Sequence, residues 1–338
     1  MKAIVCLRYG DPGAFRLEDV ERPTPGDGEV LIRVRAASLN AYDWGLTRGR
    51  PHILRAFLGI RRPRANRPGR DVAGRVESVG RNTSQFKPGD DVFGICRGSL
   101  ADYACALETS LAPKPATVSF EAAAAVPVAG LTALQGLREC GRIQPGQRVL
   151  INGAAGGVGT FAVQFAKSFG ADVTGVCSTR NLELVASIGA DRVVDYTRAD
   201  FTRSGQRYDL IFDLVANHSF FACRRVLSSH GILVAAGVGG ADGRGFGRRM
   251  GRMLTGMLIA RFTSQKMRFY VARLKQADLV TMAGLLETRK VTPVIDSRHR
   301  LSETSEAIRL LAEGHARGKI VVTMDQNGSL AAARRTTT

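Results

Sequence analysis

The sequence has few cysteines, and their spacing suits neither a metal site nor a disulfide framework. The six cysteines form no C-x-x-C pair and no tight cluster, which argues against a zinc ribbon and against a small secreted domain. The apolar run at the N-terminus is too short for a signal peptide. Elsewhere, Met253–Ala260 is far shorter than the roughly 20 residues of a membrane span. We therefore expect reduced thiols in a cytoplasmic protein.

Acidic residues are scarce relative to basic ones. Lysine and arginine number 48 against 30 aspartates and glutamates, which gives a formal net charge of +18. The basic residues concentrate in stretches 48–70 and 243–275, but neither stretch has interleaved aromatic residues, and no nucleic-acid-binding motif is visible. Such an excess favours a charged soluble surface first, an anionic substrate or cofactor second, and nucleic acid or a membrane last. We expect a small-molecule partner.

The pattern of apolar residues divides the chain into parts. Its 338 residues, 44% of them hydrophobic, are enough for two domains with their own cores. Residues 1–120 hold short strands separated by Pro-Gly and Gly-Asp pairs. Residues 121–288 alternate helix and strand patterns, which is typical of a doubly wound parallel sheet. Residues 289–324 return to extended patterns around one helix, and we expect the tail 325–338 to be disordered.

The same patterns predict the main elements. The expected strands are Glu29–Ala36, Val72–Val79, Asp91–Gly94, Val149–Ile151, Val173–Val176, Val193–Val194, Leu210–Asp213, Ile232–Ala235 and Lys319–Thr323. The expected helices are Phe120–Glu139, Thr160–Ser168, Leu182–Ser187, Phe220–Leu227 and Glu303–Glu313.

The most informative stretch is residues 149–165, VLINGAAGGVGTFAVQF, in which a buried strand meets a glycine turn and then a helix. Glycines let the main chain approach a pyrophosphate closely, and the free N–H groups of a helix start bind anions. The G-x-G-x-x-G fingerprint is met only as Ala154-x-Gly156-x-x-Gly159, which is a weak signal alone. A second strand at Ala171–Cys177 completes the strand–helix–strand unit of about thirty residues that a dinucleotide site needs.

The residues after that second strand bear on the choice of cofactor. An NAD site would place an acidic residue here for the ribose hydroxyl, but the chain has Ser178, Thr179 and Arg180. A hydroxyl and a guanidinium suit the 2′-phosphate of NADPH instead. Alternatively, Ser178 is a helix N-cap and Arg180 is a solvated residue of the first turn, and both interpretations can hold together. We expect NADPH rather than NADH.

Five motifs accompany the glycine turn in a fixed order. They are Ser38-x-Asn40-x-x-Asp43, Gly69-x-Asp71-x-x-Gly74-x-Val76, Phe86-Lys87-Pro88-Gly89-Asp90, Ala122–Ala125 with Pro127, and Gly318-Lys319-Ile320-Val321. Through them, residues 1–324 resemble the medium-chain dehydrogenase/reductase superfamily, in its zinc-lacking quinone oxidoreductase branch. The resemblance implies an α/β fold in which residues 1–122 and 289–324 form a GroES-like β-barrel catalytic domain. Residues 123–288 would form a Rossmann dinucleotide-binding domain, and the molecule would be a homodimer through that domain.

The resemblance also implies which residues surround the cofactor. Thr132 would lie beside the nicotinamide or its phosphate, and the pyrophosphate would rest on the turn. The residues implied for the turn are Gly156, Gly157 and Val158. Those implied for the 2′-phosphate are Ser178, Arg180 and Tyr196. Those implied near the nicotinamide are Ala236 and Gly237. Asp213 and Val215 would contact the ribose or simply end their strand.

Zinc is not expected. The superfamily's catalytic zinc needs a cysteine near position 40, a His-Glu pair after Gly69 and a further ligand near the linker helix. This chain has Asn40, then Arg70 and Asp71, and residues 126–132 contain no cysteine or histidine. The five histidines are scattered along the chain. We predict no metal at all.

The expected reaction is hydride transfer from NADPH to a quinone, an enone or another carbonyl compound. Without zinc, charge developing on the substrate oxygen needs hydrogen-bond donors or a cation. The catalytic candidates are Asn40 and Tyr42, on the nicotinamide side, and the cationic Arg70. Alternatively, Asn40 caps a strand end, Tyr42 is a packing residue and Arg70 is one more surface arginine. Asp43 is expected to be a structural hydrogen-bond acceptor rather than a general base.

The stretch 239–273 is glycine-rich and basic, and then apolar. It follows the strand that would end beside the nicotinamide, so it is a lid or wall of the substrate pocket, a surface helix, or an element facing a membrane. A second hypothesis for the whole chain is therefore a weakly catalytic NADPH-binding protein whose basic surface binds RNA or anionic lipid.

Overall fold

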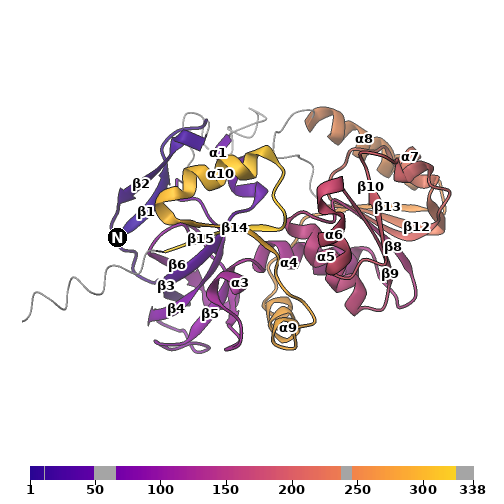
Figure 1. The fold of residues 1–338 in the computed structure, drawn as a ribbon. Helices are drawn as coiled ribbons and strands as arrows, with labels where there is room; N and C mark the ends of the chain where they lie inside the picture. The colour runs from indigo at the N-terminus through magenta and orange to yellow at the C-terminus, as the bar shows by residue number, and fades with distance from the viewer. Residues whose placement is uncertain (11, 49–65, 237–245, 325–338) are drawn as a thin grey trace, which may run out of the picture.

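The computed structural model describes residues 1–10, 12–48, 66–236 and 246–324, and these residues form two units built around separate sheets (Figure 1). One unit, at the left of Figure 1, holds the N-terminal strands together with the last helix and strand of the chain. The other unit, at the right, holds the middle of the chain. The predicted tail 325–338 and Gly237 lie outside the described residues. No helix within the described part of the chain has the length and apolar character needed to cross a bilayer.

The first unit is a barrel-like sheet of seven strands. Their order is β14-β15-β3-β4-β5-β7, with β6 paired to β3. The bounds are β3 Glu29–Ser38, β4 Asp71–Val79, β5 Asp91–Ile95, β6 Tyr103–Leu107, β7 Leu111–Pro113, β14 Ile295–Arg300 and β15 Lys319–Thr323. A separate pair, β1 Lys2–Cys6 and β2 Phe15–Asp19, packs beside it. Because β15 pairs with β3, the end of the described chain closes a sheet that its beginning opened.

The second unit is a six-stranded sheet in which every neighbouring pair is parallel. Its order is β10-β9-β8-β11-β12-β13. The bounds are β8 Arg148–Asn152, β9 Asp172–Cys177, β10 Arg192–Asp195, β11 Tyr208–Asp213, β12 Leu227–Ala236 and β13 Lys266–Tyr270. The chain moves outward from β8 in one direction and then returns to β11 on its other side, so the strand order reverses between β8 and β11. Ligands of such sheets bind at this reversal.

Helices cover both faces of the parallel sheet. The first unit is contacted by α1 Ala41–Arg48, α3 Phe120–Ala124 and α10 Thr304–Glu313. The other described helices are α4 Pro127–Gln135, α5 Gly157–Ser168, α6 Leu182–Ser187, α7 Phe220–Arg224, α8 Phe246–Ala260 and α9 Gln276–Glu287. Alternate side chains of β8 point to opposite faces: Val149 and Ile151 pack under α4 and α5, and Leu150 packs with α7. This confirms the predicted fold class of a doubly wound sheet with a GroES-like domain. The boundaries at residues 122 and 288 stay predictions.

Two predicted helices were wrong in extent. The helix expected over Phe120–Glu139 is broken into α3, α4 and a π-helical turn, Gly136–Cys140. Pro127 is the first residue of α4, and its lack of an N–H stops α3 from continuing. The helix expected over Phe220–Leu227 ends at Arg224, because Leu227 begins β12 and pairs with Tyr208 of β11.

Candidate active site

The glycine turn predicted to cradle a phosphate forms the connection between β8 and α5. Its first glycine, Gly153, has φ of 90°, and its N–H donates to Val176 O at 3.1 Å. A Cβ on Gly159 would lie 2.1 Å from Gly153 O, so only glycine allows the main chain to fold back here. Gly156 caps α5, and the N–H groups of Gly157 and the next two residues have no intrahelical acceptor. Free N–H groups at a helix start can bind an anion, so this geometry is compatible with the predicted phosphate site, which stays a prediction.

The turn is joined directly to the barrel. Gly156 forms a parallel bridge with Gly318, and Gly318 N–H donates to Ala155 O at 2.9 Å. The next residue, Lys319, runs beneath the turn: a Cβ placed on Gly157 would lie 3.1 Å from Lys319 Cδ. The start of β15 thus packs directly against the glycine turn.

A buried polar cluster surrounds the ammonium of Lys319 at the start of β15. We call Ser38, Asn40, Asp71 and Lys319 the Lys319 cluster. Lys319 Nζ donates to Asn40 Oδ1 at 2.6 Å, to Leu39 O at 3.0 Å and to Asp71 Oδ2 at 3.2 Å. Asp71 is 0% exposed and Lys319 is 3% exposed, so this is a fully desolvated ion pair. Neither was among the predicted site residues.

The Asp71 carboxylate accepts from every side of the cluster. Ser38 Oγ donates to it at 2.7 Å and Asn40 Nδ2 at 3.0 Å. The remaining oxygen accepts from Val128 N–H at the start of α4, at 2.9 Å. A buried carboxylate is tolerated when it is paired and hydrogen-bonded in this way, whereas removing one partner would leave an uncompensated charge.

Asp43 is a second buried carboxylate close by. It accepts from Asn40 N–H at 2.9 Å and from Gly69 N–H at 3.2 Å. Burial raises the pKa of Asp43 to about 6, an effect that the nearby Asp71 increases and the backbone donors oppose. These contacts fit the predicted role of a structural acceptor, because the carboxylate holds the start of α1 against the loop before β4.

The three catalytic candidates separate into two groups. Asn40 is buried, and both ends of its carboxamide are engaged within the Lys319 cluster. Tyr42 is 51% exposed, and the Arg70 guanidinium lies 5.4 Å from the centre of its ring. Tyr42 and Arg70 thus form a cation–π pair that retains solvent access, beside a buried Asn40.

Tyr270 contacts Thr132 and Ala236, two of the residues that were predicted to lie beside the nicotinamide. Its hydroxyl donates to Thr132 O, and in the β12–β13 register Tyr270 is paired with Ala236. Thr132 Oγ1 donates to Val128 O within α4. Burial raises the pKa of Tyr270 far above its usual range, so it acts as a neutral donor. Sequence reasoning missed Tyr270, since its partner Thr132 is 138 residues away.

Asp213 and Val215 occupy the end of β11. The Asp213 carboxylate accepts from Asn152 Nδ2 at 2.8 Å and from the N–H groups of Val215 and Ala216 at 3.1 and 3.0 Å. These bonds favour the strand-end alternative for Asp213. Val215 borders the glycine turn, since a Cβ on Gly153 would meet Val215 Cγ2 at 2.9 Å.

The residues predicted to bind the 2′-phosphate surround the end of β9. Arg180 is exposed, and its Nη2 donates to His315 O at 2.7 Å. Ser178 Oγ accepts from Asn181 Nδ2 at 3.2 Å, and no cap hydrogen bond comes from its side chain. Tyr196 is 56% exposed, and its N–H donates to Cys177 O at 3.0 Å.

Two further charged residues reach this corner that sequence reasoning did not include. Arg317 comes from the loop before β15, where it donates to Asn181 Oδ1 at 2.7 Å and to Arg180 O. Asp195, at the end of β10, accepts from Thr179 Oγ1 and Thr197 Oγ1, which lowers its pKa. The sequence offered one clue to Asp195, namely that it immediately precedes Tyr196, which was predicted to bind the 2′-phosphate.

Within the described residues, no three histidine, cysteine or acidic side chains are grouped so that they could hold a metal ion.

Known proteins share this fold and are similar to the chain over most of its length. Residues 26–116 match the alcohol dehydrogenase GroES-like domain family, and residues 188–322 match a family described as zinc-binding dehydrogenase. A chloroplastic quinone-oxidoreductase of Triphysaria versicolor is 35% identical over 341 residues, with 95% of this chain and 98% of the relative covered. The NADPH-dependent alkenal/one oxidoreductase of Arabidopsis thaliana chloroplasts is 33% identical over 338 residues, covering 95% and 79%.

A solved structure agrees with these relatives. The quinone oxidoreductase from Coxiella burnetii superimposes with a TM-score of 0.84 at 29% identity, over 96% of this chain and 99% of that chain. The chain therefore belongs to the medium-chain dehydrogenase/reductase superfamily and is an oxidoreductase related to the quinone oxidoreductases.

Proposed function

We propose that this enzyme uses NADPH to reduce a quinone, an enone or another carbonyl compound, and that it does so without zinc. The observation that carries the proposal is the glycine turn at the start of α5, which is bridged to the barrel at Gly318. Glycines in this turn let the main chain approach a ligand closely, which suits a pyrophosphate on Gly156, Gly157 and Val158.

The charge of the adenosine corner supports NADPH. Arg180 and Arg317 bring two guanidinium groups to the end of β9, where arginine can donate paired hydrogen bonds to a phosphate. Asp195 is engaged by threonine hydroxyls. The Arabidopsis relative, whose name specifies NADPH, adds support.

The residues at the family's zinc positions do not fit the ion. Asn40 gives both ends of its carboxamide to the Lys319 cluster, and Arg70 carries a positive charge. Asp71, the one acidic residue among them, already neutralises the ammonium of Lys319. A dication at this place would lie against two resident cations, which is unfavourable.

The cofactor would supply the hydride, and the chain's own residues would position and polarise the substrate. The Arg70 guanidinium is a candidate to stabilise negative charge developing on the substrate oxygen, because it lies on the accessible side of the site. The phenol of Tyr42 is a hydrogen-bond donor at the same place. Tyr270 and Thr132 would form the wall on which the nicotinamide rests.

Cofactor titration followed by a substrate panel tests this function. We expect NADPH to bind more tightly than NADH, and NADPH oxidation to accelerate with quinones or enones. A purified protein that binds neither nicotinamide cofactor would overturn the proposal. No specific observation favours the alternative of a weakly catalytic protein that binds RNA or lipid.

We also propose a homodimer formed through the cofactor unit. β13 is the end strand of the parallel sheet, and such an edge can pair with another strand. Exposed Phe262 and Val271 flank it, so a second copy would cover apolar surface as well. Light scattering that gives the mass of one chain at micromolar concentration would refute the dimer.

A further inference from the structure

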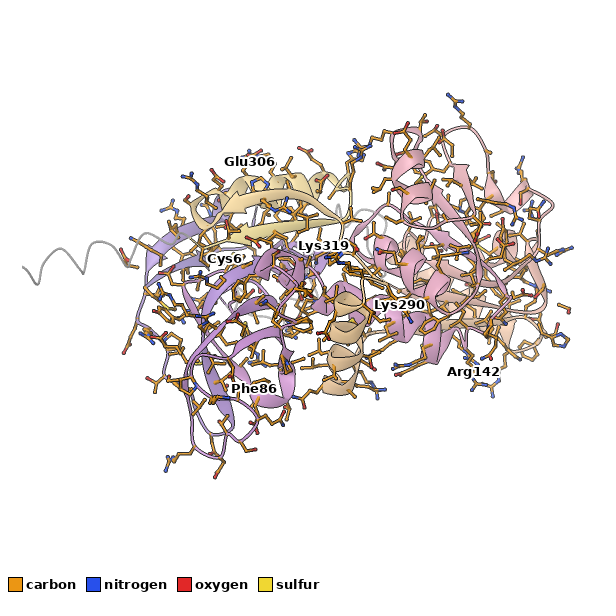
Figure 2. The ribbon with its side chains drawn as sticks, turned by 60° about the horizontal axis from the view of Figure 1, so that its bottom comes forward. Cys6, Phe86, Arg142, Lys290, Glu306 and Lys319 are labelled. Carbon is orange, nitrogen blue, oxygen red and sulfur yellow. The ribbon has the colours of Figure 1, made fainter. Side chains whose placement is uncertain are left out.

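We infer that Lys319 is a positioning residue for hydride transfer: its buried ammonium holds Asn40, and with it the connection from β3 to α1, in register with the glycine turn. The inference rests on the proposed function, since it concerns how the barrel is placed against the bound cofactor. Figure 2 shows Lys319 at the junction of the two units.

The head group of Lys319 determines the position of Asn40. Its Nζ contacts Asn40 Oδ1 and also the preceding carbonyl, Leu39 O, so side chain and main chain are held together. The carboxamide has one compatible orientation, because its Nδ2 donates to the Asp71 carboxylate while its Oδ1 accepts from the ammonium. If the amide were rotated by half a turn, its NH₂ group would face the Lys319 ammonium, donor against donor, and its oxygen would face the Asp71 carboxylate, acceptor against acceptor.

The stem of Lys319 lies against the glycine turn, while its main chain belongs to β15 of the barrel. Its Cδ lies under Gly157, and its N–H donates to Val294 O at 2.9 Å. Its neighbour Gly318 is bridged to Gly156 of the turn. One residue therefore spans from the predicted pyrophosphate site to the segment that carries Tyr42, with few rotatable bonds between them.

Stability alone is a weak reason for such a pair. A buried ion pair is often no more stabilising than well-packed apolar side chains of similar size, because both charges must be desolvated. What the charged pair adds is direction: it fixes the orientation and position of the groups that it touches. Small errors in such placement are costly, since a displacement of about 1 Å can slow a reaction by about a hundredfold.

The test uses a charge-balanced variant, Lys319→Met with Asp71→Asn, so that no lone charge remains buried. It is compared with Asn40→Leu and with the triple variant that combines all three substitutions. The control is Lys167→Met, which removes the half-exposed ion pair between Lys167 of α5 and Asp191. NADPH affinity is measured by fluorescence and hydride transfer by stopped flow with deuterated NADPH. Hydrogen exchange over residues 39–43 is followed in the cofactor-free protein.

We expect hydride transfer to slow by about 10- to 100-fold in the charge-balanced variant, while the NADPH Kd changes by less than about threefold. Protection over residues 39–43 should fall, and the triple variant should be about as slow as Asn40→Leu, because both changes act on one group. Lys167→Met should match the wild type. If the charge-balanced protein does not fold, Lys319→Arg, which keeps the charge but changes its reach, should show the same loss of rate.

Two results overturn the inference alone: an active wild type whose charge-balanced variant transfers hydride at the same rate, or losses that multiply in the triple variant. A wild type that fails to oxidise NADPH with any substrate overturns the proposed function together with it.

Discussion

The two buried carboxylates Asp71 and Asp43 have different partners, and these partners determine the charge state that each one favours. Asp71 faces an ammonium and two side-chain donors. Asp43 accepts from backbone N–H groups and has Asp71 as a like-charged neighbour, which together with burial favours its protonated form. At the residue scale, the site is therefore held by one permanent ion pair and by one acid that titrates near neutral pH.

The raised pKa of Asp43 predicts a dependence of stability on pH. Its pKa is about 6 in the folded chain against 3.8 for a free side chain. The folded state therefore binds this proton more tightly, so the contribution is complete below pH 3.8 and is lost as the pH rises through 6. Between these limits the wild type should lose about 3 kcal/mol of unfolding free energy from this group.

Urea unfolding of the wild type and of Asp43→Asn, at about pH 4 and about pH 7.5, checks this prediction. The difference between the two proteins should change with pH in favour of the variant at the higher value. Asp19→Asn is the control, because Lys2 lowers the pKa of that exposed carboxyl. An equal pH dependence in wild type and Asp43→Asn would show that Asp43 ionises normally.

Arg180 predicts the cofactor preference. Arg180→Ala should raise the Kd for NADPH by about tenfold and leave the Kd for NADH within about twofold, because a charged hydrogen bond to phosphate is lost. Arg142→Ala removes an exposed arginine at the far edge of the same unit (Figure 2) and should change neither. Fluorescence titration with both cofactors measures the effect, and an unchanged preference would refute the 2′-phosphate assignment.

At the scale of elements, the connection from β8 to α5 combines several constraints in seven residues. Gly153 supplies the left-handed backbone, Gly159 allows the helix to pack against Gly153 O, and the bridge from Gly156 to Gly318 attaches the turn to the barrel. The turn thus depends on the absence of side chains more than on any hydrogen bond that a side chain makes.

Gly159→Ala tests that dependence. The added methyl would lie 2.1 Å from Gly153 O, so we expect a loss of about 1 to 3 kcal/mol in stability and weaker NADPH binding. Gly284→Ala, on the exposed face of α9 with nothing within 4 Å of the new Cβ, should instead stabilise by about 0.5 to 1 kcal/mol. Thermal unfolding of both proteins decides, and a Gly159→Ala variant as stable as the wild type would contradict this description of the turn.

At the scale of the whole molecule, the glycine turn at the strand reversal of the parallel sheet is attached to the barrel-like sheet. The barrel-like unit holds the Lys319 cluster and the Tyr42–Arg70 pair, and the other unit holds the turn and the hydrogen bond from Tyr270 to Thr132. Lys319 pairs with Asp71 and Arg70 precedes Asp71 in the chain, so two cations lie at or next to the positions where the resemblance implies zinc ligands.

This arrangement predicts that removing metals leaves the enzyme active. Protein washed with a chelator should retain its rate of NADPH oxidation, and elemental analysis should find far less than one zinc per chain. Adding zinc back should not raise the rate. Activity that disappears with the chelator and returns with zinc would reject the zinc-free mechanism.

The sequence predicted those features that depend on neighbouring residues. The expected strand Glu29–Ala36 is found as Glu29–Ser38, and the helix Leu182–Ser187 is found with the same bounds. The break at Pro127 was missed because the alanine-rich run around it reads as one helix, although proline cannot continue α3. Asn40 was named from the sequence as a site residue, which stays a prediction, and its partners Asp71 and Lys319 could not be named.

By itself, the sequence determined the parallel sheet and the glycine turn, and it supplied the prediction that Ser178 and Arg180 suit a 2′-phosphate. Each of these follows from periodicity or from side-chain chemistry over a few positions. The tertiary structure alone decided that Lys319 pairs with Asp71, 248 residues away, and that Arg317 joins Arg180 from 137 residues away. Tyr270 reaches Thr132 in the same manner. Contacts of this range leave no periodic signal, because they arise only when segments far apart in the sequence pack together in the folded chain.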